Sequence, residues 1–216
     1  MVRARRDARR TLEAVVTGNG KVRNGSDGRA ARGWRSRRAE GPSYRHVAIT
    51  GAAGAIGGAL ARAMRAAWPA CELALIDRDH DALVALAREL GGHRHDMHGG
   101  ATVHVADLRD VDALPALVET IEQAGPLDGL VNCAGVMKVQ HVSTWRWSDA
   151  RDLLTIDLLA PLRLQDLLVR GMVERGRGLV VNVASMAGRV PLRGAAYYGA
   201  SKAGLAMASE IARPDP

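Results

Sequence analysis

Residues 50–57 read Thr50-Gly51-Ala52-Ala53-Gly54-Ala55-Ile56-Gly57 and are the most informative run for the fold of this chain. The apolar residues 46–50 before it predict a short strand, and the Ala-rich residues 55–67 predict a helix. Glycines in such a turn let the backbone approach a pyrophosphate, and the start of a helix offers free N–H groups and a positive dipole end. Because the turn lies between a strand and a helix, it predicts a dinucleotide site.

The alternation of strand and helix patterns continues along the chain from residue 46. Strands are expected at 46–50, 73–77, 102–106, 127–132 and 178–184, and helices at 55–67, 81–90, 111–124, 148–174 and from 196. This order predicts an α/β fold, a doubly wound (Rossmann-like) parallel sheet with helices on both faces. Ligands of such sheets bind at the carboxyl ends of the strands.

The basic charge of the chain belongs to its first segment. Residues 1–45 hold 13 Lys and Arg against 4 Asp and Glu, whereas residues 46–216 hold 17 against 19. The first segment has no sustained apolar period and contains turn-forming Asn-Gly pairs, so it is expected to be a disordered extension. A nucleic-acid-binding arm and an organelle transit peptide are the alternatives that its Arg clusters leave open. Residues 46–216 are expected to form one dinucleotide-binding domain.

Composition narrows the class of protein further. Hydrophobic residues make up 47% of the chain without a single Phe, so the core must be aliphatic. Two cysteines imply no disulfide framework and favour a reduced, cytoplasmic setting. No apolar run approaches the ~18 residues of a membrane span. The histidines at 93, 95 and 98 have a spacing that could hold a metal, but their Gly-rich surroundings favour a polar loop and no metal site.

An acidic residue at the end of the second strand bears on which dinucleotide is bound. Asp77 follows Gly57 by 20 residues, where a carboxylate would accept hydrogen bonds from a ribose 2′-OH and repel a 2′-phosphate. Arg78 is its neighbour and could accommodate that phosphate. The carboxylate favours NAD(H), with NADP(H) as the alternative.

The ends of the third and fourth strands carry further candidates for cofactor contacts. Asp107 and Leu108 follow the third strand, where they could meet the adenine end of the cofactor. Asn132-Cys133-Ala134-Gly135 follows the fourth strand, and its Ala134-Gly135 backbone could pass under the nicotinamide ribose. Asp and Asn also cap helices and turns routinely, so each residue alone has a second interpretation.

A serine, a tyrosine and a lysine near the end of the chain predict its chemistry. Tyr198 follows Ser185 by 13 residues, and Lys202 follows Tyr198 by four. On a helix, this last spacing places both side chains on one face. A nearby ammonium stabilises a phenolate, which suits a tyrosine that exchanges a proton with an alcohol or carbonyl oxygen. A serine at a strand end could hold the same oxygen.

Taken together, these residues resemble the short-chain dehydrogenase/reductase family across nearly all of residues 46–211. The matching positions are Thr50–Gly57, Asp77, Asp107, Asn132–Gly135, Ser185, Tyr198 and Lys202. The resemblance implies a nicotinamide-dependent oxidoreductase that interconverts a small-molecule alcohol and a ketone. It also implies that Tyr198 is the general acid-base, that Lys202 binds the nicotinamide ribose, and that Ser185 orients the substrate oxygen.

Two positions depart from the family pattern. In the Gly-rich turn, Ala55 stands where the family commonly has its middle glycine, an arrangement that also fits the extended, epimerase-like branch. Asn132–Gly135 and the Ser185–Tyr198 interval favour the dehydrogenase branch. Asp157 stands where the family usually has an asparagine that supports a water-mediated proton relay. Asp157 is therefore a catalytic candidate, or else a polar residue on the solvated side of a long helix.

The end of the chain is the third departure. Only 14 residues follow Lys202, whereas family members continue with further strands, a turn that touches the nicotinamide and a substrate lid. We therefore expect a domain that is incomplete at its C-terminus, and a cofactor-binding remnant without turnover is the rival interpretation. Relatives usually form dimers or tetramers through the helices that correspond to 148–174 and 196–211, so a homo-oligomer is a further expectation.

Overall fold

The computed structural model describes residues 44–91 and 99–212. The predictions for the basic extension, apart from its last two residues, and for the three histidines at 93, 95 and 98 lie outside these residues. Within the described part, no helix has both the length and the apolar character that crossing a bilayer would require.

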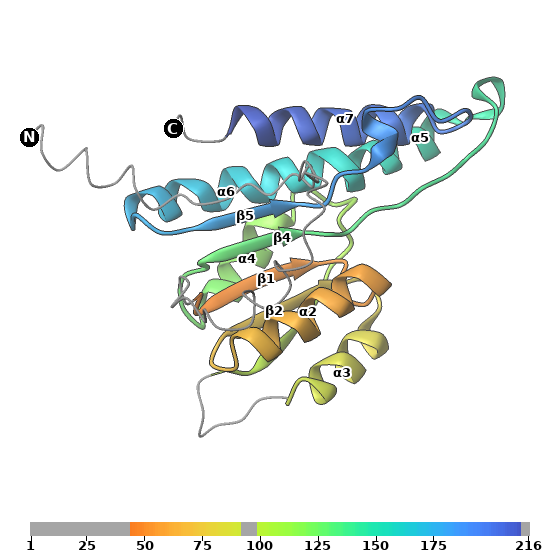
Figure 1. The fold of residues 1–216 in the computed structure, drawn as a ribbon. Coiled ribbons are helices and arrows are strands. Elements are labelled where there is room, and N and C mark those ends of the chain that lie inside the picture. The colour runs from red at the N-terminus through yellow and green to blue at the C-terminus, as the bar shows by residue number, and fades with distance from the viewer. Residues whose placement is uncertain (1–43, 92–98, 213–216) are drawn as a thin grey trace, which may run out of the picture.

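A parallel five-stranded sheet forms the centre of the molecule (Figure 1). Its strands are β1 (His46–Thr50), β2 (Glu72–Asp77), β3 (Ala101–Val105), β4 (Gly129–Asn132) and β5 (Leu179–Asn182). Their order in the sheet is β3-β2-β1-β4-β5, and each neighbouring pair is parallel. The order reverses between β1 and β4, which places a ligand crevice above the carboxyl ends of these strands. The predicted doubly wound α/β fold is confirmed.

Helices cover both faces of this sheet (Figure 1). They are α2 (Ala55–Ala67), α3 (His80–Glu89), α4 (Leu114–Glu122), α5 (Trp147–Leu154), α6 (Ala160–Glu174) and α7 (Ala196–Ile211), with short turns η3 (Val142–Thr144), η4 (Thr155–Leu159) and η5 (Met186–Gly188). Ile49 and Leu75 pack with α2 and α3 on one face, whereas Ala48 and Ile76 pack with α4 and α6 on the other. Because both faces are covered, the central strands read as continuous apolar runs.

The expected single helix over 148–174 is wrong in one respect, because a π-helical turn, η4, separates α5 from α6. Pro161 lies in the first turn of α6 and has no N–H to donate to the carbonyl of Asp157 four residues earlier. An α-helix therefore cannot run unbroken through this segment. Single π-turns within α-helices are frequent at functional sites.

Other predicted elements differ from the structure only in their bounds. The helix expected over 111–124 begins at Leu114, because Asp110 accepts a hydrogen bond from the N–H of Ala113 and closes a turn before it. The strand expected over 178–184 is limited to the four residues of β5.

A chain of buried amides joins the last two strands to the helices. Asn132 and Asn182 are opposite each other in β4 and β5, and Asn132 Nδ2 donates to Asn182 Oδ1 at 2.8 Å. Asn182 Nδ2 in turn donates to Ser209 Oγ near the end of α7 at 2.8 Å. Asn132 also donates to the carbonyl of Pro161 at 3.3 Å. These bonds satisfy both amide nitrogens and Asn182 Oδ1, which would be costly to bury alone, whereas Asn132 Oδ1 has no hydrogen-bond partner among the described residues.

Candidate active site

The Gly-rich turn forms a cradle that side chains would fill. Gly51 has a φ of 68°, and a Cβ there would lie 2.7 Å from the backbone of Ala134. A Cβ on Gly57 would lie 2.1 Å from the carbonyl oxygen of Gly51. Helix α2 begins after Gly54 without a side-chain cap, so its first N–H groups remain for a ligand. The turn therefore has the geometry of an anion site at a helix N-terminus.

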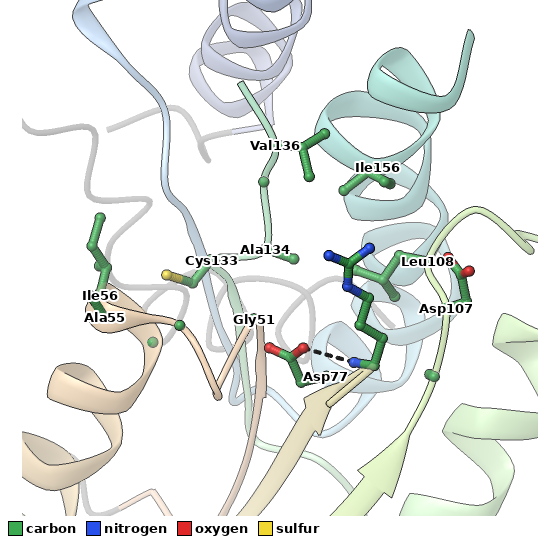
Figure 2. A pocket seen from close by; sticks show the side chains of 15 residues that line it. Gly51, Ala55, Ile56, Asp77, Asp107, Leu108, Cys133, Ala134, Val136 and Ile156 are labelled. Carbon is green, nitrogen blue, oxygen red and sulfur yellow. Dashed lines mark hydrogen bonds between the residues drawn. The ribbon is translucent and has the colours of Figure 1, made fainter. Parts of the chain in front are cut away.

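The carboxylate of Asp77 is held against this turn at the end of β2 (Figure 2). Its Oδ2 accepts a hydrogen bond from the N–H of Ala53 at 3.1 Å, and its Oδ1 accepts from the N–H groups of Arg78 at 2.7 Å and Asp79 at 3.3 Å. Three backbone donors thus fix the orientation of the carboxylate. Arg78 lines the same cavity.

The carboxylate of Asp107, at the end of β3, is engaged by a neighbouring arginine. Arg109 donates to both Asp107 oxygens, and its Nη1 is 3.6 Å from Asp152 on α5. Hydrogen bonds from Arg109 lower the pKa of Asp107 to about 2. Asp107 lines the cavity as expected, but it faces a cation of its own chain. The loop after β3 is thereby joined to α5.

The loop after β4 is positioned by Thr50, the last residue of β1. Thr50 Oγ1 accepts hydrogen bonds from the N–H groups of Cys133 at 3.1 Å and Ala134 at 3.2 Å. Asn132, also expected to contact the cofactor, instead directs its amide into the buried network with Asn182. Burial raises the pKa of the Cys133 thiol, although the nearby Lys202 opposes the shift.

These strand ends enclose a cavity of about 420 Å³. It is lined by Gly51, Gly54, Ala55, Ile56, Gly57, Asp77, Arg78, Ala106, Asp107, Leu108, Cys133, Ala134, Gly135, Val136 and Ile156. Figure 2 shows the Gly-rich turn on one side of this cavity and Leu108 with Ile156 on the other. The structure thus brings together most of the residues predicted to bind the cofactor. Thr50, Ala53, Asn132, Tyr198 and Lys202 are the predicted contacts outside the lining.

Four lining residues were not named individually as cofactor contacts, although Cys133 lies within the predicted run Asn132–Gly135. They are Ala106, Cys133, Val136 and Ile156. Ala106 and Val136 adjoin predicted residues at strand ends, so their positions in the sequence could have indicated them. No sequence pattern indicated Ile156, because the side of the helix that it occupies depends on the π-turn.

Tyr198 and Lys202 lie one turn apart on α7, as their spacing predicts. The Nζ of Lys202 is 5.8 Å from the centre of the Tyr198 ring. It donates to the carbonyl of Val183, just beyond β5, at 3.3 Å, and lies 3.5 Å from Asp157 Oδ2. The Lys202 side chain is almost fully buried, and a Cβ on Gly135 would lie 3.2 Å from its Nζ. Because Gly135 lines the cavity, the ammonium lies close behind the cavity wall.

Ser185 lies between β5 and η5, and its Oγ accepts a hydrogen bond from the N–H of Ala187 at 3.2 Å. Turn η5 packs closely on α7. A Cβ on Gly188 would lie 2.7 Å from the backbone of Lys202, and one on Gly199 would lie 2.9 Å from the carbonyl oxygen of Ala187. Ser185 is thereby brought to the end of the sheet on which Tyr198 and Lys202 lie.

Asp157 is completely buried on the π-turn η4. The interpretation that placed it on the solvated side of a helix is therefore wrong. Its Oδ1 accepts a hydrogen bond from the N–H of Val136 at 2.7 Å. Burial raises the pKa of the Asp157 carboxyl, and the Lys202 ammonium and the Val136 N–H partly oppose this. Among the described residues, no cluster of side chains suits a metal ion.

Comparison with known proteins identifies the family to which this fold and cavity belong. The short chain dehydrogenase family matches residues 45–215. D-threitol dehydrogenase of Mycolicibacterium smegmatis is 34% identical over 163 residues, which are 76% of this chain and 61% of that protein. The chain belongs to the short-chain dehydrogenase family.

Solved structures agree in fold. A metagenomic short-chain oxidoreductase in complex with NADP superposes with a TM-score of 0.71 at 31% identity, over 78% of this chain and 74% of that one. NAD⁺-bound xylitol dehydrogenase gives a TM-score of 0.68 at 29% identity, over 78% of this chain and 63% of that one. The chain spans 57% and 61% of the length of two curated relatives that it matches.

Proposed function

We propose that this chain carries the cofactor site and the catalytic residues of a nicotinamide-dependent oxidoreductase that interconverts an alcohol and a carbonyl compound. The observation that carries the proposal is the continuity of the site. The cavity extends from the Gly-rich turn to Gly135 and Val136, and a Cβ on Gly135 would lie 3.2 Å from the Lys202 ammonium. A dinucleotide that spans this cavity would bring its reactive ring to the Tyr198 side.

The residues present fit a dinucleotide. Gly51 and Gly57 leave space that a Cβ would fill, and the uncapped start of α2 offers N–H donors to a pyrophosphate. Leu108 and Ile156 offer apolar surface to a ring. When bound, the nicotinamide would supply or accept the hydride, which is the part of the chemistry that side chains cannot perform.

The chain's own residues would handle the proton. In the reducing direction Tyr198 would donate its hydroxyl proton to the carbonyl oxygen, and in the oxidising direction it would accept the proton of the alcohol. Lys202 would stabilise the phenolate that Tyr198 becomes when it donates its proton in the reducing direction. Ser185 would donate a hydrogen bond to the same substrate oxygen and so hold it in place.

We propose NAD(H) as the preferred cofactor because Asp77 is held at the turn by three backbone donors. A carboxylate fixed there can accept hydrogen bonds from a ribose 2′-OH and repels a 2′-phosphate. Arg78 also lines the cavity and supports NADP(H) as the alternative. Titration of NADH and NADPH against the protein, followed by nicotinamide fluorescence, compares the two affinities directly.

A homo-oligomer stays a prediction. Four large apolar side chains on η4, α6 and α7 are exposed, namely Leu159, Val173, Met207 and Ile211. They lie on the helices through which relatives associate. Sedimentation equilibrium over a range of protein concentrations measures the assembly state.

The activity is tested with NADH and a panel of small ketones, and in the reverse direction with NAD⁺ and the matching alcohols. Oxidation of NADH that depends on the ketone supports the proposal. Tight NADH binding without turnover on any ketone or alcohol would instead identify a cofactor-binding remnant.

A further inference from the structure

Three segments of the chain meet at the buried carboxylate of Asp157. Its Oδ1 accepts the hydrogen bond of Val136 N–H at 2.7 Å, and its Oδ2 lies 3.5 Å from Lys202 Nζ. A Cβ on Gly135 would lie 3.5 Å from Oδ1, so the carboxylate is packed directly against the backbone that lines the cavity. Asp157 therefore links the π-turn to the loop after β4 and to α7.

The charge of this carboxylate matters because its partner is also buried. The side chain of Lys202 is 5% exposed, and that of Asp157 is 0% exposed. Buried charges are stable only when they are paired and hydrogen-bonded. The family resemblance leads us to expect an asparagine at this position. An asparagine could accept a hydrogen bond from the Val136 N–H, but it would carry no charge to pair with the Lys202 ammonium.

The surroundings of Asp157 allow it to take up a proton. Burial raises the pKa of its carboxyl, while Lys202 lowers it, and Oδ2 is buried without a hydrogen-bond partner. Lys202 is also the sole charged side chain, among the described residues, that contributes to this pKa. Within residues 44–91 and 99–212, the other titratable groups near Lys202 are Tyr198, whose ring centre is 5.8 Å from Nζ, and the Cys133 thiol, whose pKa burial raises.

We propose that Asp157 is a positioning residue that works as a charge-dependent clamp. When ionised, it holds the Lys202 ammonium and the Gly135–Val136 backbone in the arrangement that borders the cavity. When Asp157 is protonated, its electrostatic attraction to the Lys202 ammonium is lost. The Gly135–Val136 backbone that borders the cavity is then held less firmly. The clamp makes cofactor affinity sensitive to acid. This regulation rests on the proposed function, because the cavity that it borders is the proposed dinucleotide site.

The first test is the pH dependence of NADH binding in the wild type, in Asp157→Asn and in a matched control, Asp166→Asn. Asp166 lies on α6, is 70% exposed and pairs with Arg163 at the surface. As the pH is lowered through the range in which the Asp157 carboxyl takes up its proton, wild-type affinity for NADH is expected to fall, by up to about tenfold per pH unit for one linked proton. Asp157→Asn removes this dependence, and Asp166→Asn keeps it. A wild-type pH profile in folded Asp157→Asn overturns the clamp.

A second test needs neither turnover nor a bound cofactor. The carboxyl carbon of Asp157 is followed by NMR during a pH titration of the wild type and of Lys202→Met. Removal of the ammonium leaves the carboxylate without its counter-charge, so the midpoint of its titration must rise. An unchanged midpoint overturns the clamp even if NADH binds. Failure of NADH to bind at any pH overturns the proposed function, while the NMR titration still decides on the clamp.

Discussion

The cavity joins two regions that differ in how they are built. We call the Gly-rich turn with Asp77 and the loop after β3, where we propose that the cofactor binds, the cofactor half. We call Asp157, Ser185, Tyr198 and Lys202, which we propose carry out or position the proton transfer, the catalytic half. In the cofactor half the shape comes from backbone, as at Gly57, where a Cβ would lie 2.1 Å from a carbonyl oxygen. In the catalytic half it comes from side chains, two of them buried charges 3.5 Å apart.

Because the two halves are built differently, different kinds of substitution should impair them. Backbone geometry tolerates changes of charge but not added volume, since the interior is close-packed. A buried ion pair tolerates small changes of volume but not the loss of one charge. Substitutions in the cofactor half should therefore lower NADH affinity, whereas substitutions in the catalytic half should lower kcat or change the pH dependence.

Tyr198→Phe should give the largest effect, and it should impair the catalytic half without impairing the cofactor half. This change removes the proposed acid-base and keeps the ring, so kcat should fall by about 10² to 10⁴, the usual contribution of proton transfer. NADH affinity should stay close to that of the wild type. Tyr197→Phe is the matched control, because the neighbouring ring packs edge-on against Trp145 at 4.9 Å between centroids. Equal kcat values for wild type and Tyr198→Phe would contradict the assignment.

Gly57→Ala should have the opposite pattern of effects, because it should lower the affinity for NADH rather than kcat. The new Cβ must displace the Gly51 carbonyl, and overpacking of this kind costs about 1–3 kcal/mol, which corresponds to roughly 5- to 150-fold in affinity. NADH titration measures the loss. In the control Gly58→Ala, the nearest atom is the end of the Arg62 side chain at 3.1 Å, which can move. If both variants bind NADH like the wild type, the cradle is not the phosphate site.

Asp77→Asn tests charge within the cofactor half. Without the negative charge, a 2′-phosphate is no longer repelled, so the preference should shift toward NADPH by at least about fivefold, given ~1 kcal/mol for charges 4 Å apart in water. The ratio of the two dissociation constants is the measurement. Asp79→Asn removes the same charge two residues away and keeps a residue able to cap α3, where Asp79 accepts from Ala82 at 3.0 Å. A shift of similar size in this control would point to a general charge effect.

Arg109→Gln should give the smallest effect. It should slightly lower the free energy of unfolding near neutral pH and leave it unchanged in acid. The folded-state pKa of Asp107, about 2, lies below its ordinary value of 3.8. The pair therefore stabilises the fold above about pH 4, and its contribution is lost as the pH falls toward 2. Urea midpoints should differ slightly between wild type and variant near neutral pH and converge near pH 2. Arg151→Gln on α5 is the control, and a gap that widens with acid would contradict this pairing.

Much of the fold could be predicted because its strands are short apolar runs bounded by turn residues, as at His46–Thr50 and Gly129–Asn132. Covered on both faces, such strands leave little choice of architecture. Helix bounds were harder, because they depend on local hydrogen bonds such as the one from Ala113 to Asp110. The π-turn before Pro161 was not foreseen, although the missing N–H of a proline can be read from sequence.

The two halves of the site also differed in how far they could be predicted. The cofactor half follows from glycine spacing, since backbone approach needs glycine wherever it occurs. In the catalytic half, spacing placed Tyr198 and Lys202 on one helix face, but the burial of Asp157 depends on the packing of α7 against η4. The inward turn of Asn132 likewise depends on tertiary contacts, whereas Arg109, the partner of Asp107, is only two residues away in the chain.

The buried amide chain limits the position of α7 along its own axis. Ser209 Oγ receives the Asn182 amide two turns beyond Lys202, so α7 cannot slide along its axis without losing this bond. A slide of one turn, about 5.4 Å, in one direction would bring the apolar Leu205 opposite the Asn182 amide. In the other direction, the amide would lie beyond the last residue of α7. The Ser209 hydroxyl, seven residues beyond Lys202, thus fixes where Tyr198 and Lys202 lie along the helix axis relative to β5.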